Sequence, residues 1–306
     1  MIKSAIHRVI SILPRSHRWN ELFQKHVTGS LELGPGGFEE RLDFCRRHLE
    51  YFFGVQPQRR ENFSVLELGT GWFPVVPIGL YLCGASEIWT FDIVPLLRSS
   101  RLKRMLGYFC ESDQKGVLKN VLPWVQPGRM ARLREAFENV ENESPEALLN
   151  KLKIHVLIRD AQNTGLNPGS IDLFVSTTVL EYIQNEVLEG IVSEFKRLSS
   201  PNAVMSHYID LYDQYSVFDH SITPFNFLRY STNRWKWFRS PLIPLNRLRI
   251  SDYRALHVKA GFEVAKEVNT CGSAQDLGKI PLAPEFQKYS KADLLVLTSW
   301  LVSKAV

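Results

Sequence analysis

Apolar residues along the chain alternate between strand-like runs and helix-like spacings. The run 65–68 breaks at Gly69-Thr70-Gly71 and resumes with helical spacing from Val75 to Leu82, which is the pattern of a buried strand, a glycine turn and a helix. Further strands are predicted over 87–92, 154–158, 170–176, 203–208, 262–268 and 294–301, and further helices over 96–109, 130–152, 185–198 and 251–260. Strands that alternate with helices predict an α/β fold with a doubly wound, mainly parallel sheet.

The pattern divides the chain into a helical N-terminal extension over 1–60 and a sheet domain over 61–306. Within the extension, helices are predicted over 1–13 and 38–53. The first is amphipathic and basic, so it either packs on the body of the protein or rests on a membrane surface. Two insertions in the domain, at about 95–152 and 210–250, are candidates for a substrate cap.

The composition is that of a globular protein: 306 residues, of which 44% are hydrophobic. No apolar stretch is long enough for a membrane-spanning helix, and the N-terminus lacks the long apolar core of a signal peptide. The four cysteines are widely scattered, which predicts reduced thiols rather than a metal pair or a disulfide framework. We therefore expect a cytoplasmic protein.

The net charge of +5 is a mild basic bias and does not by itself predict a nucleic-acid partner. Basic residues are spread over several segments, as on ordinary solvated faces. A surface for an anionic substrate or an anionic lipid stays open as an alternative.

The glycine turn and three acidic or small residues suggest a nucleotide-like cofactor. Gly69 and Gly71 leave room for a ligand beside the backbone at the end of a strand, although an ordinary turn has the same glycines. Asp92 ends the next strand, where a carboxylate can accept both hydroxyl hydrogens of a ribose. Asp160 can accept from an adenine amine with Ala161 leaving room for the ring, or it can simply cap a turn.

Four of these segments together resemble the class I S-adenosylmethionine-dependent methyltransferases: 65–71 (VLELGTG), 88–92 (IWTFD), 159–161 (RDA) and 170–183 (SIDLFVSTTVLEYI). The resemblance covers roughly 64–268. It implies a Rossmann-like, mainly parallel seven-stranded sheet and the cofactor S-adenosyl-L-methionine, converted to S-adenosyl-L-homocysteine. The third glycine of the nicotinamide fingerprint is absent, which weakens an assignment to NAD.

The resemblance also implies roles for individual residues. Asp92 would hold the ribose hydroxyls, Ile93 would pack on the adenine, and Asp160 with Ala161 would meet the adenine amine. The methionine and ribose part would be lined by Glu67, Gly69, Thr70 and Gly71, and the sulfonium would lie near Ser176 and Thr177. The sequence Ser-Thr-Thr at 176–178 differs from the Asn-Pro-Pro-Tyr motif of amide and base methyltransferases, which favours a small-molecule or glycan-type acceptor.

The candidate catalytic residues follow the fifth predicted strand. His207 is the expected general base of an O-methylation because the pKa of an unperturbed histidine is near neutral, with Asp210 or Asp213 orienting the ring. A core histidine satisfied by the backbone is the alternative. The same carboxylates suit Mg²⁺, but no spacing fixes a coordination geometry, so we expect no metal.

Aromatic residues interleaved with arginines fill 212–249. They predict either a substrate lid with an apolar wall or a packed subdomain with exposed arginines. Two further functions stay open beside methyl transfer. One is an NAD-dependent oxidoreductase or epimerase, and the other is a non-catalytic partner protein that kept the sheet.

Overall fold

A computed structural model describes residues 33–217, 219–238 and 245–306. The helix expected over 1–13, and with it the suggested membrane contact, lies outside these residues. Among the residues that are described, no helix has both the length and the apolar character needed to cross a membrane.

The core of the molecule is a seven-stranded sheet with the strand order β3-β2-β1-β4-β5-β7-β6. Strands β1 to β5 pair in parallel, whereas β7 is antiparallel to both of its neighbours, β5 and β6. This confirms the expected α/β, mainly parallel, doubly wound fold. The strands are β1 (Phe63–Leu68), β2 (Ala85–Asp92), β3 (Ile154–Ile158), β4 (Ile171–Thr177), β5 (Ser199–Asp210), β6 (Phe262–Cys271) and β7 (Val296–Ala305).

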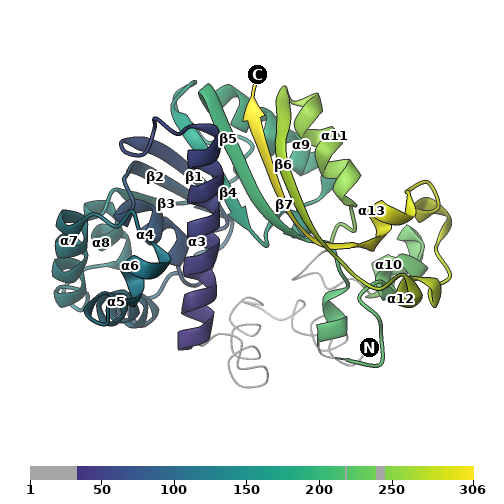
Figure 1. Cartoon of the computed structure of the whole chain (residues 1–306), viewed down its shortest axis with the longest axis horizontal. Coiled ribbons are helices and arrows are strands. Elements are labelled where there is room, and N and C mark those ends of the chain that lie inside the picture. The colour runs from purple at the N-terminus through teal and green to yellow at the C-terminus, as the bar shows by residue number, and fades with distance from the viewer. Residues whose placement is uncertain (1–32, 218, 239–244) are drawn as a thin grey trace.

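Helices cover both faces of this sheet (Figure 1). One face packs on α3 (Pro35–Val55), α4 (Val75–Leu82), α5 (Ser99–Gln114), α6 (Val117–Val121), α7 (Pro127–Glu138) and α8 (Pro145–Lys151). The other face packs on α9 (Asn185–Leu198) and α11 (Ile250–Lys259). Side chains of β4 alternate between the two: Leu173 and Val175 face the first group of helices and Phe174 faces the second.

The prediction of one helix over 130–152 is wrong. The structure has two helices in this region: α7 ends at Glu138, and α8 begins at Pro145. Proline has no backbone N–H to donate inside a helix, but it fits the first helical turn. Here the Ser144 side chain caps α8 by accepting from the Ala147 N–H at 3.2 Å. The Ser-Pro pair therefore starts a new helix instead of continuing the old one.

The last predicted strand, 294–301, also differs from the structure. Its first residues belong to a short helix, α13 (Lys291–Leu295), whose N-terminus is capped by the Ser290 side chain accepting from the Asp293 N–H. The strand β7 starts at Val296 and extends beyond the prediction to Ala305. A serine cap thus takes the first apolar residues of the run into a helix.

The aromatic segment after β5 forms a third core. Phe225, Phe227 and Trp235 are buried against Leu277 and Phe286, which come from the segment that precedes β7. This core includes residues from α10 (Thr232–Phe238) and α12 (Ala274–Gly278), which lie together beyond one end of the sheet (Figure 1). The rings therefore pack a subdomain, as in the second of the two expectations, but only some of its arginines are exposed: Arg229 and Arg234 face solvent, whereas Arg247 and Arg249 are buried.

Two buried arginines hold this subdomain in place, Arg247 by bonds within it and Arg249 by bonds to the ends of β5 and β7. The Arg247 guanidinium donates to the Phe227 and Tyr230 carbonyls. The Arg249 side chain, which is fully buried, donates to the Leu211 carbonyl at 2.7 Å and to the carbonyls of Leu294 and Val296. Buried hydrogen bonds therefore fix the segment 247–249 in place.

Replacing Arg249 with methionine keeps much of the side-chain volume but removes the guanidinium N–H groups that donate to the carbonyls of Leu211, Leu294 and Val296. Because a buried acceptor without a donor costs about 1–3 kcal/mol, we expect R249M to lower the free energy of unfolding by about 3 kcal/mol. Urea unfolding followed by circular dichroism measures this loss. The exposed Arg234 gives the control R234M, expected within about 0.5 kcal/mol of the wild type. Equal midpoints for R249M and R234M would contradict the role of Arg249.

Candidate functional site

The turn after β1 is held tightly at its first glycine. Gly69 has a φ of +88°, and its N–H donates to the Phe91 carbonyl of β2 at 2.8 Å. A Cβ added at this position would clash with the side chain of Val179, which follows β4. Gly69 is therefore required by packing between two turns, and its missing side chain is filled by Val179 rather than by open space.

The second glycine of the turn has free space beside its backbone. Gly71 has a φ of +62°, and a Cβ placed on it would have no neighbour within 4 Å. Its N–H donates to Asp92 Oδ2 at 3.0 Å, while Asp92 Oδ1 accepts from the Val94 N–H at 3.1 Å. The next side chain, Ile93, is 81% exposed. An open backbone, a half-buried carboxylate and an exposed apolar side chain thus lie together at the ends of β1 and β2.

Glu67 and Thr70 belong to a buried chain of hydrogen bonds under this turn. Thr90 Oγ1 donates to Glu67 Oε2 at 2.7 Å and lies 2.6 Å from Thr70 Oγ1. Burial is the main cause that raises the pKa of Glu67 to about 8, and the charge of Asp92 adds to the rise. The Glu67 carboxyl is therefore neutral at pH 7, and it positions the turn through Thr90 and Thr70.

The end of β3 brings two further predicted residues beside Asp92. The Arg159 N–H donates to the Asp92 carbonyl at 3.0 Å, which places the following residues at the same sheet edge. Asp160 is exposed, and both of its carboxyl oxygens accept from Gln162, from the backbone N–H at 2.9 Å and from the side-chain amide at 2.8 Å. Ala161 is 4% exposed. Asp160 is therefore exposed to solvent, and its hydrogen bonds from Gln162 stabilise the turn that follows β3.

The hydroxyls at the end of β4 bond to histidines inside the protein. Ser176 Oγ lies 2.8 Å from His207 Nδ1, and Thr177 Oγ1 lies 3.2 Å from Nε2 of His48 on α3. Ser176 is fully buried. We find that its side chain points into the core, while the backbone of 176–178 remains at the sheet edge.

The structure does not support His207 as a general base. Its ring is 1% exposed and packs between Phe195 of α9 and His257 of α11. Burial, with the nearby His257 and His48, lowers the pKa of His207 well below its usual value. Neither predicted orienting carboxylate bonds to it, because its Nδ1 bonds to Ser176 and its Nε2 has no partner. His207 is the core histidine that the sequence left as the alternative.

Asp210 and Asp213 lie apart from His207 for reasons of strand geometry. Residues 207 and 210 are three positions apart along β5. Because side chains alternate between the two faces of a strand, these two point to opposite faces of the sheet. Asp213 is buried beyond the strand, where it accepts from the Tyr215 N–H at 3.0 Å and from the Asn226 amide at 3.1 Å. Asp213 thus organises the third core, and only Asp210 stays near the sheet edge.

A residue missed in the sequence lies next to Asp210. Glu181, in the short 3-10 helix η2 (Leu180–Tyr182) after β4, is 2% exposed, and neither of its carboxyl oxygens has a hydrogen-bond partner among the described residues. Burial raises its pKa well above the usual value, and the charge of Asp210 raises it further. The signal was present in the sequence: a glutamate inside the otherwise apolar run VLEYI directly after a strand.

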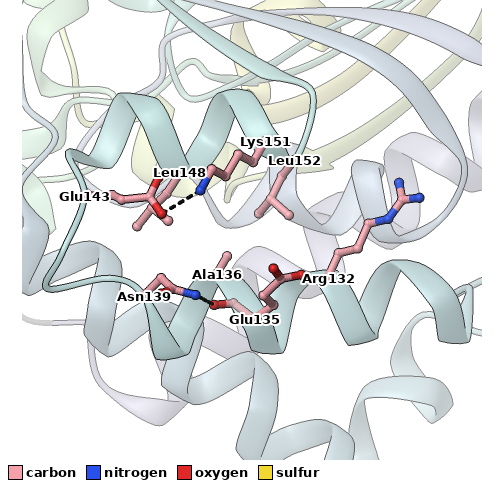
Figure 2. Close-up of a pocket in the computed structure, with 8 residues that line it drawn as sticks. All are labelled: Arg132, Glu135, Ala136, Asn139, Glu143, Leu148, Lys151 and Leu152. Carbon is pink, nitrogen blue, oxygen red and sulfur yellow. Dashed lines mark hydrogen bonds and ion pairs between the residues drawn. The ribbon is translucent and has the colours of Figure 1, made fainter.

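A groove of about 150 Å³ lies elsewhere, between α7 and α8 (Figure 2). Its rim carries the Lys151–Glu143 ion pair at 2.6 Å and the Asn139 amide bonded to the Glu135 carbonyl. None of the predicted site residues lines it. In the part of the chain that is described, no group of three or more His, Cys, Asp or Glu side chains is placed to hold a metal ion. The candidate site is therefore the edge formed by the carboxyl ends of β1, β2, β4 and β5.

Solved structures similar to the chain include methyltransferases. One is a geranyl diphosphate C-methyltransferase from Streptomyces coelicolor A3(2), with a TM-score of 0.46, 9% identity, and coverage of 84% of this chain and 78% of that chain. S-adenosylmethionine-dependent methyltransferases from Mesorhizobium loti and Methanosarcina mazei each have a TM-score of 0.44 and 12% identity, covering 82% of this chain and 95% and 96% of theirs. No family model matches, and no curated protein matches.

The contact between Gly69 and Val179 predicts a rescue experiment. An alanine at position 69 would carry the cost of a left-handed backbone, about 1–2 kcal/mol, and an overpacking cost of about 1–3 kcal/mol against Val179. G71A would carry the backbone cost alone. We expect the double variant G69A/V179A to be more stable than the sum of the two single changes predicts, as measured by urea unfolding. Additive losses would contradict the contact.

The buried histidines predict a pH-dependent stability. Burial lowers the pKa of His48 and His257 to about 3, whereas both bind protons below about pH 6.5 when unfolded. The stability that the folded protein gains from keeping these two histidines neutral is therefore lost as the pH falls from about 6.5 towards 3. Glu67 and Asp210, whose pKa values are raised, act in the opposite direction, so a variant is needed to isolate one group.

We expect the stability of the wild type relative to H257Q to fall by about 1.4 kcal/mol for each pH unit below 6.5. Urea unfolding of both proteins between pH 7.5 and 5 measures the difference. The exposed His220 supplies the control H220Q. A wild-type advantage over H257Q that is constant across this range would show that His257 protonates without cost in the folded protein.

Proposed function

We propose that this protein transfers a methyl group from S-adenosyl-L-methionine to a small-molecule acceptor. The observation that carries the proposal is the juxtaposition of Gly71, Asp92 and Ile93 at the ends of β1 and β2. This is the edge of an open α/β sheet at which ligands bind, and it combines an open backbone with a ribose-type acceptor and an apolar wall.

The residues at this edge fit a nucleoside. A carboxylate has about four lone-pair sites, of which Asp92 uses two for the N–H groups of Gly71 and Val94, so two remain for the ribose hydroxyls. Ile93, exposed beside it, offers an apolar surface for a base. Asp160 would meet the amine edge with lone pairs that Gln162 leaves free.

When bound, S-adenosyl-L-methionine supplies a methyl group whose bond to the sulfonium sulfur breaks as a nucleophile attacks the methyl carbon in line with that bond. The protein's part is to orient the nucleophile and to take up its proton. Asp210 is the group that we assign to proton uptake, because it lies at the edge between β4 and β5 and its pKa is raised to about 6, mainly by burial. The O-methylation expected from the sequence depended on His207, so this structure gives it no support of its own.

Asp92 supplies the test. Hydrogen bonds to a charged group contribute about 1.5–3 kcal/mol each, so D92A should weaken binding of S-adenosyl-L-homocysteine at least tenfold, and D92N should weaken it less. Isothermal titration calorimetry measures both. The partly exposed Asp276, which pairs with Lys279 far from this edge in the chain, gives the control D276A, for which the dissociation constant should not change.

The same titration separates the nicotinamide alternative. NAD⁺ is run against the wild type under identical conditions. We expect S-adenosyl-L-homocysteine to bind more tightly than NAD⁺. Tighter binding of NAD⁺, or a D92A dissociation constant equal to that of the wild type, would overturn the assignment of this edge to the methyl donor.

A further inference from the structure

A carboxyl group without a side-chain partner among the described residues is enclosed at the acceptor side of the proposed site. Glu181 is 2% exposed, and within the described part of the chain neither of its oxygens accepts a well-formed hydrogen bond, although the backbone N–H groups of Glu181 and Asp210 lie near enough to act on its pKa. Leaving a buried polar group unpaired costs about 1–3 kcal/mol, and more for a charged group. The backbone around it is fixed, since its carbonyl accepts from the Asn246 N–H at 2.8 Å and the Asn246 amide donates to the neighbouring carbonyls of Leu180 and Ile183.

A second carboxyl lies beside it without a cation. Asp210 ends β5 and carries a hydrogen bond from the Tyr212 hydroxyl. Glu40 of α3 is also near enough for its charge to act on Asp210. No ion pair to Glu181 or Asp210 occurs within the described residues. The site therefore holds acceptor oxygens in excess of its donors.

The aromatic groups around the pair are consistent with a bound cation. Tyr182 and Tyr212 both lie close enough to Asp210 for its charge to act on their hydroxyls, and Tyr182 already accepts from the Gln214 amide. Tyrosine faces attract organic cations. A hydroxyl brings one donor to such a site, whereas a primary ammonium brings three.

We propose that the acceptor of the methyl group is a primary or secondary amine, which binds as its ammonium ion with N–H groups donated to the carboxyls of Glu181 and Asp210. This inference rests on the proposed function and names the substrate class for it. The unpartnered Glu181 side chain carries it, because a ligand rich in N–H donors is what the enclosed oxygens lack.

The methyl transfer then balances as follows. The ammonium gives one N–H proton to the Asp210 carboxylate, which frees the nitrogen lone pair. This lone pair forms the new N–C bond while the S–C bond of the donor breaks, and the electron pair of that bond stays on the sulfur. The sulfonium becomes a neutral thioether, the product amine is again a cation, and the proton on Asp210 passes to solvent.

The experiment compares two probes that differ only in the head group: 2-phenylethylammonium chloride and 2-phenylethanol. Each is titrated by calorimetry into protein saturated with S-adenosyl-L-homocysteine, and again into protein without it. We expect the ammonium to bind at least tenfold more tightly than the alcohol. In the isosteric variants E181Q and D210N, its dissociation constant should rise at least tenfold.

The exposed Glu186 in the first turn of α9 gives the matched control E186Q, which should bind the ammonium like the wild type. Binding of S-adenosyl-L-homocysteine to E181Q and D210N shows that these variants are folded. Equal affinity for both probes, no binding of the ammonium up to 10 mM, or an unchanged constant in E181Q would overturn the amine inference. Loss of S-adenosyl-L-homocysteine binding by the wild type would instead overturn the proposed function, while the donor-free titration still tests the amine.

Discussion

The two-residue period of the strands is the constraint on which this structure depends. Because helices cover both faces of the sheet, each strand residue is committed to one of two cores, and polar side chains must find partners there. Along β5, Ser206 faces α3 and bonds to His48, whereas His207 faces α9 and α11. The side chains to which we assign functions, Asp92, Glu181 and Asp210, lie at the ends of the strands or in the turn after β4.

Local signals made much of the fold predictable. The predicted bounds of β3 and α9 agree with the structure residue for residue, since a short apolar run or a clear helical spacing has turn residues on both sides. The Gly71–Asp92 arrangement was also predictable, because it depends on two motifs in one βαβ unit. For Glu181 the sequence shows only a glutamate inside an apolar run; its position beside Asp210 comes from the approach of the η2 turn to the end of β5, which no sequence spacing encodes. His207 was predicted at the site because it lies near the end of a strand, but its side chain belongs to a face of the sheet that helices cover.

Several titratable groups buried next to the sheet stay uncharged near neutral pH. Burial keeps His48 and His257 neutral and keeps Glu67 protonated, so no net charge lies under the glycine turn apart from the Asp92 carboxylate at its rim. Electrostatic interactions are stronger in such a medium than in water. In such a medium the Asp210 carboxylate would attract an ammonium acceptor strongly before it takes up the proton that frees the nitrogen lone pair.

The position of β7 has a consequence for how the chain is made. β7 separates β5 from β6 in the sheet, yet it follows both in the chain (Figure 1). During synthesis the free edge of β5 must wait until the whole segment 211–295 has emerged. An unpaired, apolar strand edge is a template for pairing with other chains. Until β7 is made, the edge of β5 that β7 later covers is therefore open to pairing with other chains.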